Sequence, residues 1–136
     1  MPVIRGTEAR VTKTPNAVMT TYASPTQGGT DTALWRVDMP PAISGPLHVI
    51  DTEQIWTIIA GALTVTIDSE QFAATTGDTL ILPANTPRQL HSHPESGFSA
   101  IATSPAHSHA YVPTTDPDSD SQSQSQSPQI TPPWIA

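Results

Sequence analysis

Apolar and polar side chains alternate along most of the chain between residues 17 and 104, in short runs separated by Gly, Pro, Asp and Thr. Alternation places successive side chains on opposite faces of a β-strand, and no stretch keeps a helical pattern for three turns. Asp68 and Ser69 are predicted to form a tight turn between two strands. Many short strands at this spacing predict an all-β sandwich or barrel. The predicted strands are 17–23, 32–39, 47–50, 54–60, 62–67, 70–75, 78–83, 87–92 and 98–104.

The alternating pattern ends near residue 113. Residues 114–129 are rich in Ser, Gln and Asp and have no apolar surface to offset the entropy of ordering, so they are predicted to be a flexible linker. A phosphorylation cluster is the alternative interpretation of their Ser-Gln repeat. Residues 130–136 place Trp134 after two prolines and are predicted to dock as a hook on the barrel or on a partner subunit. Residues 1–113 would then form a single barrel domain with an N-terminal arm.

Charge and composition exclude several classes of function. The formal net charge is −7 with five Lys and Arg residues in total, so no basic surface for nucleic acid or an anionic membrane is expected. The chain has no cysteine, which excludes thiolate catalysis and cysteine-ligated metal. No apolar run approaches the ~18 residues of a membrane span, and the first residues lack the apolar run of a signal peptide. The expected location is the cytoplasm.

Two segments contain glycine, proline and histidine at characteristic spacings. GPLHVIDTEQIWTIIAG, residues 45–61, resembles the first motif of the cupin superfamily, in which two histidines one residue apart precede a glutamate and, after six residues, a glycine. GDTLILPANTPRQL, residues 77–90, resembles the second motif, which runs glycine, five residues, proline, one residue, glycine, two residues, histidine. The resemblance covers roughly residues 30–105 and implies a cupin-type antiparallel β-barrel of the jelly-roll kind.

The resemblance also locates the positions at which cupins hold a metal ion. His48 stands at the first of them, but Ile50, Gln54 and Arg88 stand at the other three. A first-row metal needs three or four converging N, O or S donors, whereas isoleucine supplies none and arginine brings a permanent positive charge. We therefore expect no metal and no other cofactor at this site.

Two His-Ser-His sequences are further candidates for metal ligands, His91 with His93 and His107 with His109. An antiparallel hairpin formed by 87–92 and 98–104 would place the two pairs at opposite ends of the sheet, about 20 Å apart at ~3.3 Å per residue. They are expected to be exposed loop histidines, with adventitious nickel or zinc as the alternative.

The cupin layout and strand alternation together imply which side chains face the interior. A buried guanidinium must be paired, so either Asp38 or an anionic ligand is expected to meet the interior arginines. On the outward face, Ile55, Thr57 and Ile59 form an apolar stripe that a second copy would cover, which predicts a homodimer. The implied interior set is Leu34, Arg36, Asp38, His48, Ile50, Gln54, Trp56, Ile58, Arg88, Leu90, Phe98, Ala100, Ala102 and Ser104.

Two functions from different classes fit this cavity. The first is a metal-independent enzyme, a lyase, isomerase, epimerase or cyclase, that acts on a small anionic or polyoxygenated metabolite. His48 would be the general acid/base and Arg88, with Arg36, would hold the anion, while Gln54 and Trp56 would contact the substrate. The second function is small-molecule binding without catalysis, in which the same cavity only binds. The alternative for His48 and Trp56 themselves is that they are core residues. A metal-dependent dioxygenase is the third.

Overall fold

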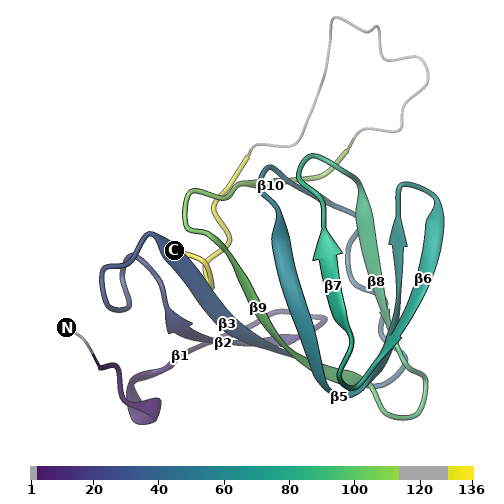
Figure 1. Cartoon of the computed structure of the whole chain (residues 1–136), viewed down its shortest axis with the longest axis horizontal. Helices are drawn as coiled ribbons and strands as arrows, with labels where there is room; N and C mark the ends of the chain where they lie inside the picture. The colour runs from purple at the N-terminus through teal and green to yellow at the C-terminus, as the bar shows by residue number, and fades with distance from the viewer. Residues whose placement is uncertain (1–2, 114–128) are drawn as a thin grey trace, which may run out of the picture.

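The computed structural model of the chain describes residues 3–113 and 129–136 and confirms the all-β prediction (Figure 1). Antiparallel strands form two layers that pack face to face as a jelly roll, preceded by a short 3₁₀ helix, Gly6–Glu8. The hydrophobic pattern does not predict β1 and β10, because β1 is a polar edge strand and β10 has two residues. The strands are β1 (Arg10–Lys13), β2 (Val18–Ala23), β3 (Thr32–Met39), β4 (Val49–Ile50), β5 (Gln54–Ile67), β6 (Glu70–Thr75), β7 (Thr79–Leu82), β8 (Arg88–Ser92), β9 (Phe98–Pro105) and β10 (Ala110–Tyr111).

The long strand β5 joins the two layers. Its first half pairs with β9 and β7, and its second half pairs with β6 and β8. The predicted strands 54–60 and 62–67 are therefore one strand that changes partners at Gly61, where φ is 73° and the pairing with β9 shifts register between Ile58 and Ala60. Glycine adopts this left-handed conformation without the steric cost that a Cβ imposes.

The segment before β4 lies beside β8. Isolated bridges join Ser44 to His91 and His48 to Arg88, and β4 pairs with β10. His48 and Arg88 exchange both backbone hydrogen bonds, at 3.1 and 3.0 Å, so they stand directly opposite one another. Residues opposed in this way project their side chains from the same face of the sheet.

The interior register is as expected on three strands and reversed on the fourth. Buried residues alternate along β8 and β9 from Arg88 and Phe98, and along the first half of β5 from Gln54 to Ile58. On β3 the buried residues are Ala33, Trp35, Val37 and Met39, whereas Leu34, Arg36 and Asp38 face outward. The prediction that these last three line the interior is wrong, because burying the indole and the two aliphatic side chains removes far more apolar surface from water.

The turns follow the sequence closely. Asp68 and Ser69 have φ values of 48° and 76°, which confirms the predicted tight turn between β5 and β6. Asn85, with φ 58°, stands where the second cupin motif has its second glycine. Asparagine tolerates the left-handed region better than most residues, so the turn before β8 is preserved.

The outward apolar stripe predicted on β5 is exposed. Ile55 and Ile59 are 40% and 41% accessible, and Ile81, which pairs with Ile55, is 60% accessible. A second copy of the chain as the cover of this stripe stays a prediction. We expect sedimentation velocity to give the mass of a dimer for the wild type and that of a monomer for Ile81→Asp, whereas a wild-type monomer would contradict it.

The predicted linker 114–129 lies, apart from residue 129, outside the described residues. Residues 130–136 lie against the barrel of the same chain (Figure 1). Ile135 is fully buried there and Trp134 is partly buried. Among the described residues, no helix is long and apolar enough to cross a membrane.

Candidate functional site

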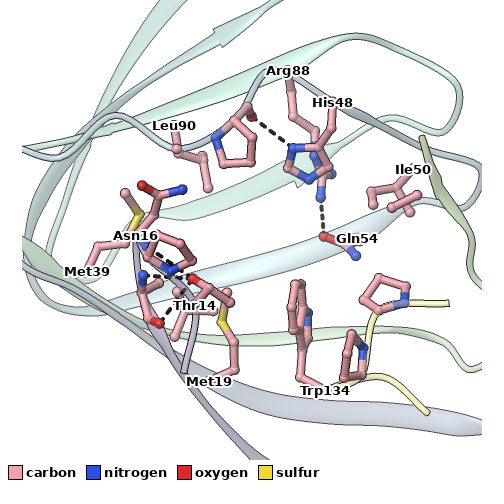
Figure 2. Close-up of a pocket in the computed structure, with 18 of the residues that line it drawn as sticks. Thr14, Asn16, Met19, Met39, His48, Ile50, Gln54, Arg88, Leu90 and Trp134 are labelled. Atoms are coloured by element: carbon pink, nitrogen blue, oxygen red, sulfur yellow. Dashed lines mark hydrogen bonds between the residues drawn. The ribbon is translucent and has the colours of Figure 1, made fainter. Parts of the chain in front are cut away.

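A cavity of about 590 Å³ lies between the two layers. This volume falls in the range of small-molecule sites in proteins. The residues that line it include four of those predicted from the sequence, namely His48, Gln54, Trp56 and Arg88. Figure 2 shows His48 and Arg88 on one side of the cavity, with Trp134 of the C-terminal segment on the other.

Arg88 is the buried charge of this cavity. It lies at the start of β8 and is 3% exposed. Its Nη2 donates to Gln54 Oε1 at 2.6 Å, but Nε and Nη1 are buried and have no partner among the described residues. Burial lowers its pKa to about 9, so the guanidinium is still protonated at neutral pH. A buried cation with two unpaired donors is costly unless an acceptor reaches it.

Gln54 fixes one edge of the guanidinium. Its Oε1 accepts from Arg88 and also from Trp56 Nε1, at 3.0 Å. Strand alternation on β5 places Gln54 and Trp56 on the same face, which makes the second bond local. The amide therefore holds Arg88 in one orientation without neutralising it.

His48 stands opposite Arg88 and is neutral at physiological pH. Its Nδ1 lies 2.9 Å from the Pro46 carbonyl oxygen. A carbonyl oxygen only accepts, so Nδ1 carries the hydrogen and the lone pair of the neutral ring is on Nε2. Desolvation, followed by repulsion from Arg88, lowers the pKa of His48 to about 4, although the bond to Pro46 acts in the opposite direction.

The rest of the cavity wall is largely apolar and comes from parts of the chain that the motifs do not include. Residues 14–17 form a turn in which Thr14 Oγ1 accepts from the backbone N–H groups of Asn16 and Ala17. β10 and the C-terminal segment close the opposite side. The sequence signal for Trp134 was its place in the terminal hook, but nothing in the sequence assigned it to the cavity. The apolar and aromatic wall residues include Met19, Val37, Met39, Ile50, Leu90, Tyr111, Ile130 and Trp134.

The cupin domain family model matches residues 35–103, slightly over half of the 136-residue chain. The chain is a cupin. A search of curated proteins finds no match.

Solved structures similar to this cupin include a cupin-2 domain protein from Rhodospirillum rubrum, with TM-score 0.71, 13% identity, and coverage of 83% of this chain and 80% of that chain. The polyketide cyclase RemF from Streptomyces resistomycificus has TM-score 0.65 and 15% identity, covering 77% and 79%. DMSP lyase DddQ from Ruegeria pomeroyi has TM-score 0.63 and 19% identity, covering 74% and 57%. At these identities the similarity establishes the fold.

The metal positions of the family do not form a set of metal ligands in this cupin. The oxygen of Gln54 already accepts two N–H donors, and Ile50 has no donor atom. The guanidinium of Arg88 brings a positive charge to the place where a cation would bind. His48 is then a single donor, whereas first-row metals require three or four.

The other histidines lie apart from the cavity. His109 Nδ1 lies 2.8 Å from Asp51 Oδ2, and His91 Nδ1 lies 2.9 Å from Ser44 Oγ. No group of three or more His, Asp or Glu side chains that could hold a metal occurs among residues 3–113 and 129–136.

Arg36 and Asp38 form an ion pair on the outward face of β3, with Arg36 Nε 3.1 Å from Asp38 Oδ2. The expectation that Arg36 contacts a ligand in the cavity is wrong, since the reversed register of β3 turns it away. Asp38 consequently does not neutralise Arg88. An anionic ligand, the second expected partner of Arg88, stays a prediction.

The low pKa of His48 predicts a dependence of stability on pH. The unfolded chain binds a proton with the ordinary pKa of 6.5, whereas the folded protein binds it only near 4. Between these values the unfolded state binds more protons, so the free energy of unfolding falls as the pH is lowered from about 6.5 to about 4. Thermal unfolding at several pH values should show this fall, and it should be smaller in His48→Asn. An identical slope in that variant would contradict the assignment.

Proposed function

We propose that this cupin is a metal-independent enzyme that acts on a small organic anion with an apolar body. The observation that carries the proposal is Arg88, which lines a 590 Å³ cavity and whose Nε and Nη1 are buried with no partner among the described residues. Nε and Nη1 lie on opposite edges of the guanidinium, so each would take a separate acceptor, and a carboxylate or enolate oxygen that reached either one would satisfy it. The surrounding wall is mainly apolar, which favours an anion with an apolar body over a polyoxygenated metabolite.

In the proposed reaction, Arg88 donates to the oxygen that carries or develops negative charge, and His48 Nε2 removes a proton from the neighbouring carbon. The electron pair of the C–H bond forms the C=C bond of the enolate, and the charge on its oxygen is held by the guanidinium. Return of the proton to a different carbon completes an isomerisation. Expulsion of a leaving group by the enolate completes a lyase reaction.

The substrate itself would make His48 a better base. Repulsion from Arg88 is one cause of the lowered His48 pKa. An anion on Arg88 would offset that repulsion and raise the His48 pKa, although burial, the larger cause of the low pKa, would remain. A higher pKa would make the imidazole a stronger base. The fold is compatible with such chemistry, since similar structures include a protein described as a polyketide cyclase and one described as a DMSP lyase.

The second candidate is a cupin that binds the same kind of anion without turnover. The pKa of about 4 for His48 favours it, because a base that weak removes protons slowly from carbon. The two candidates share the binding role of Arg88 and differ in whether His48 reacts. Binding and turnover therefore have to be measured separately.

We expect the wild type to accelerate exchange of the benzylic protons of phenylpyruvate, an aromatic α-keto acid, for solvent deuterium. Proton NMR in D₂O follows the exchange, and calorimetric titration follows binding. His48→Asn should bind phenylpyruvate but lose about 10²-fold or more of the acceleration, the usual contribution of a general base. Arg88→Met should lose binding.

Arg36→Met is the matched control, because it removes an arginine that lies outside the cavity. It should bind and exchange as the wild type does. Binding without acceleration by the wild type would favour the non-catalytic candidate. Acceleration that survives in His48→Asn would overturn the role of the imidazole.

A further inference from the structure

The C-terminal segment is held on the barrel by bonds at several points along its length. Ile130 pairs with Ala110 through two backbone hydrogen bonds of 2.7 and 3.1 Å. Further along, Arg10 Nη2 donates to the Pro133 carbonyl at 3.0 Å, and Thr21 Oγ1 donates to the Trp134 carbonyl at 2.7 Å. The backbone on either side of the Trp134 side chain is thereby fixed before any ligand binds.

Neighbouring residues of this segment have different surroundings. Ile135 is fully buried in the core cluster that contains Trp35 and Val37, whereas Trp134 is partly buried and lines the cavity. Burial of Ile135 anchors the segment, so the indole does not have to hold the segment in place. An indole held in this way at a cavity wall provides a flat apolar surface at little cost in conformational entropy.

Trp134 lies across the cavity from the charged side. Figure 2 shows its ring pointing into the space below Gln54, with His48 and Arg88 beyond the amide. Two flexible thioethers, Met19 and Met39, also line the cavity, and methionine sulfur contacts aromatic rings favourably. The cavity therefore has a cationic side, formed by Arg88, and an apolar wall that includes Trp134 and the two methionines.

We propose that Trp134 is a specificity-determining residue that selects anions with a planar aromatic body over saturated anions of the same size. The ring of the ligand stacks on the indole while its carboxylate or enolate oxygen meets Arg88; this second contact rests on the proposed function. The stacking of the ligand ring on the indole depends only on the position of Trp134 in the cavity wall.

The test compares 2-naphthoate with decahydronaphthalene-2-carboxylate, which has the same carbon skeleton and charge but no aromatic ring. Calorimetric titration gives the affinity of each acid for the wild type and for Trp134→Leu, which keeps an apolar side chain. We expect the ratio of the two affinities to fall by about 3- to 10-fold in the variant, the usual size of an aromatic stacking contribution. Ile135→Val, the control on the same segment, should leave the ratio unchanged.

An NMR titration of the wild type provides a second measurement that does not depend on the folding of Trp134→Leu. The chain has three tryptophans, and the indole Nε1–H signal of Trp134 is the one absent from Trp134→Phe. Addition of 2-naphthoate should shift this signal more than the saturated acid does.

The two proposals fail in different ways. An unchanged affinity ratio in Trp134→Leu, or an indole signal of Trp134 that does not respond to 2-naphthoate, would overturn the role of Trp134 even if Arg88→Met no longer bound either acid. Conversely, if Arg88→Met bound both acids as tightly as the wild type and Trp134→Leu still lost the preference, the proposed function would fail and the inference about Trp134 would stand.

Discussion

Arg88→Met is expected to be more stable than the wild type and unable to bind an anion. The free protein keeps a protonated guanidinium buried with two N–H groups unpaired among the described residues. Methionine has a similar length, no charge and no donor to satisfy, and Gln54 Oε1 keeps its bond from Trp56. We expect the free energy of unfolding to rise by about 1–3 kcal/mol, which thermal or urea unfolding measures directly.

The matched control is Arg36→Met, in which the lost arginine is 39% exposed and paired with Asp38. Exposed ion pairs contribute little, so its stability should change by less than about 1 kcal/mol. A stabilised Arg88→Met beside a neutral Arg36→Met would show that Arg88 is kept at a cost to the fold. A clear loss of stability in Arg88→Met would instead mean that Arg88 supports the barrel.

Gly61→Ala is expected to lower the free energy of unfolding by about 2–5 kcal/mol, a large part of the stability of a domain of this size. Gly61 has φ 73°, and a Cβ there would overlap the carbonyl oxygen of Gly97 and crowd the Cα of Phe98. Because these are backbone atoms next to β9, they cannot move aside without breaking the pairing of β5 with β9. Chemical unfolding monitored by circular dichroism measures the loss.

Gly29→Ala separates the two causes of that loss. Gly29 has nearly the same φ, 71°, but a Cβ there meets nothing within 4 Å. Only the conformational cost of about 1–2 kcal/mol should remain. Equal losses in the two variants would show that the close approach at Gly61 is unimportant.

Most of the fold could be predicted from the sequence because alternation is a local signal. The 32–39 and 70–75 runs coincide with β3 and β6, and the Asp68-Ser69 turn has the predicted conformation. The wrong register on β3 was inferred from the family layout. The alternation alone would have placed Trp35 and Val37 on one face of the strand and Arg36 and Asp38 on the other. Where the alternation and the family layout conflict, the burial of apolar side chains determines which face of the strand points inward, because it contributes most of the stabilising free energy.

Only one wall of the candidate site could be predicted from the sequence. His48, Gln54, Trp56 and Arg88 could be placed in one cavity because the two motifs fix their register on neighbouring strands. The opposite wall could not be predicted, because Trp134 and the turn at 14–17 reach the cavity through contacts between distant parts of the chain. The lack of a carboxylate partner for Arg88 among the described residues could not be predicted either, because it depends on Asp38 facing outward in the folded structure.

The central claim is that the cavity binds an anion through Arg88, and the affinities of 2-naphthoate and 2-naphthamide test it most directly. The two compounds share their ring system and differ in whether the head group is an anion or a neutral amide. Calorimetric titration at pH 7 should show that the wild type binds the carboxylate at least about 10-fold more tightly, because hydrogen bonds to a charged group are worth more than neutral ones. Arg88→Met should lose this preference and no longer bind the carboxylate more tightly than the amide. Equal affinities of the wild type for the acid and the amide would contradict the account.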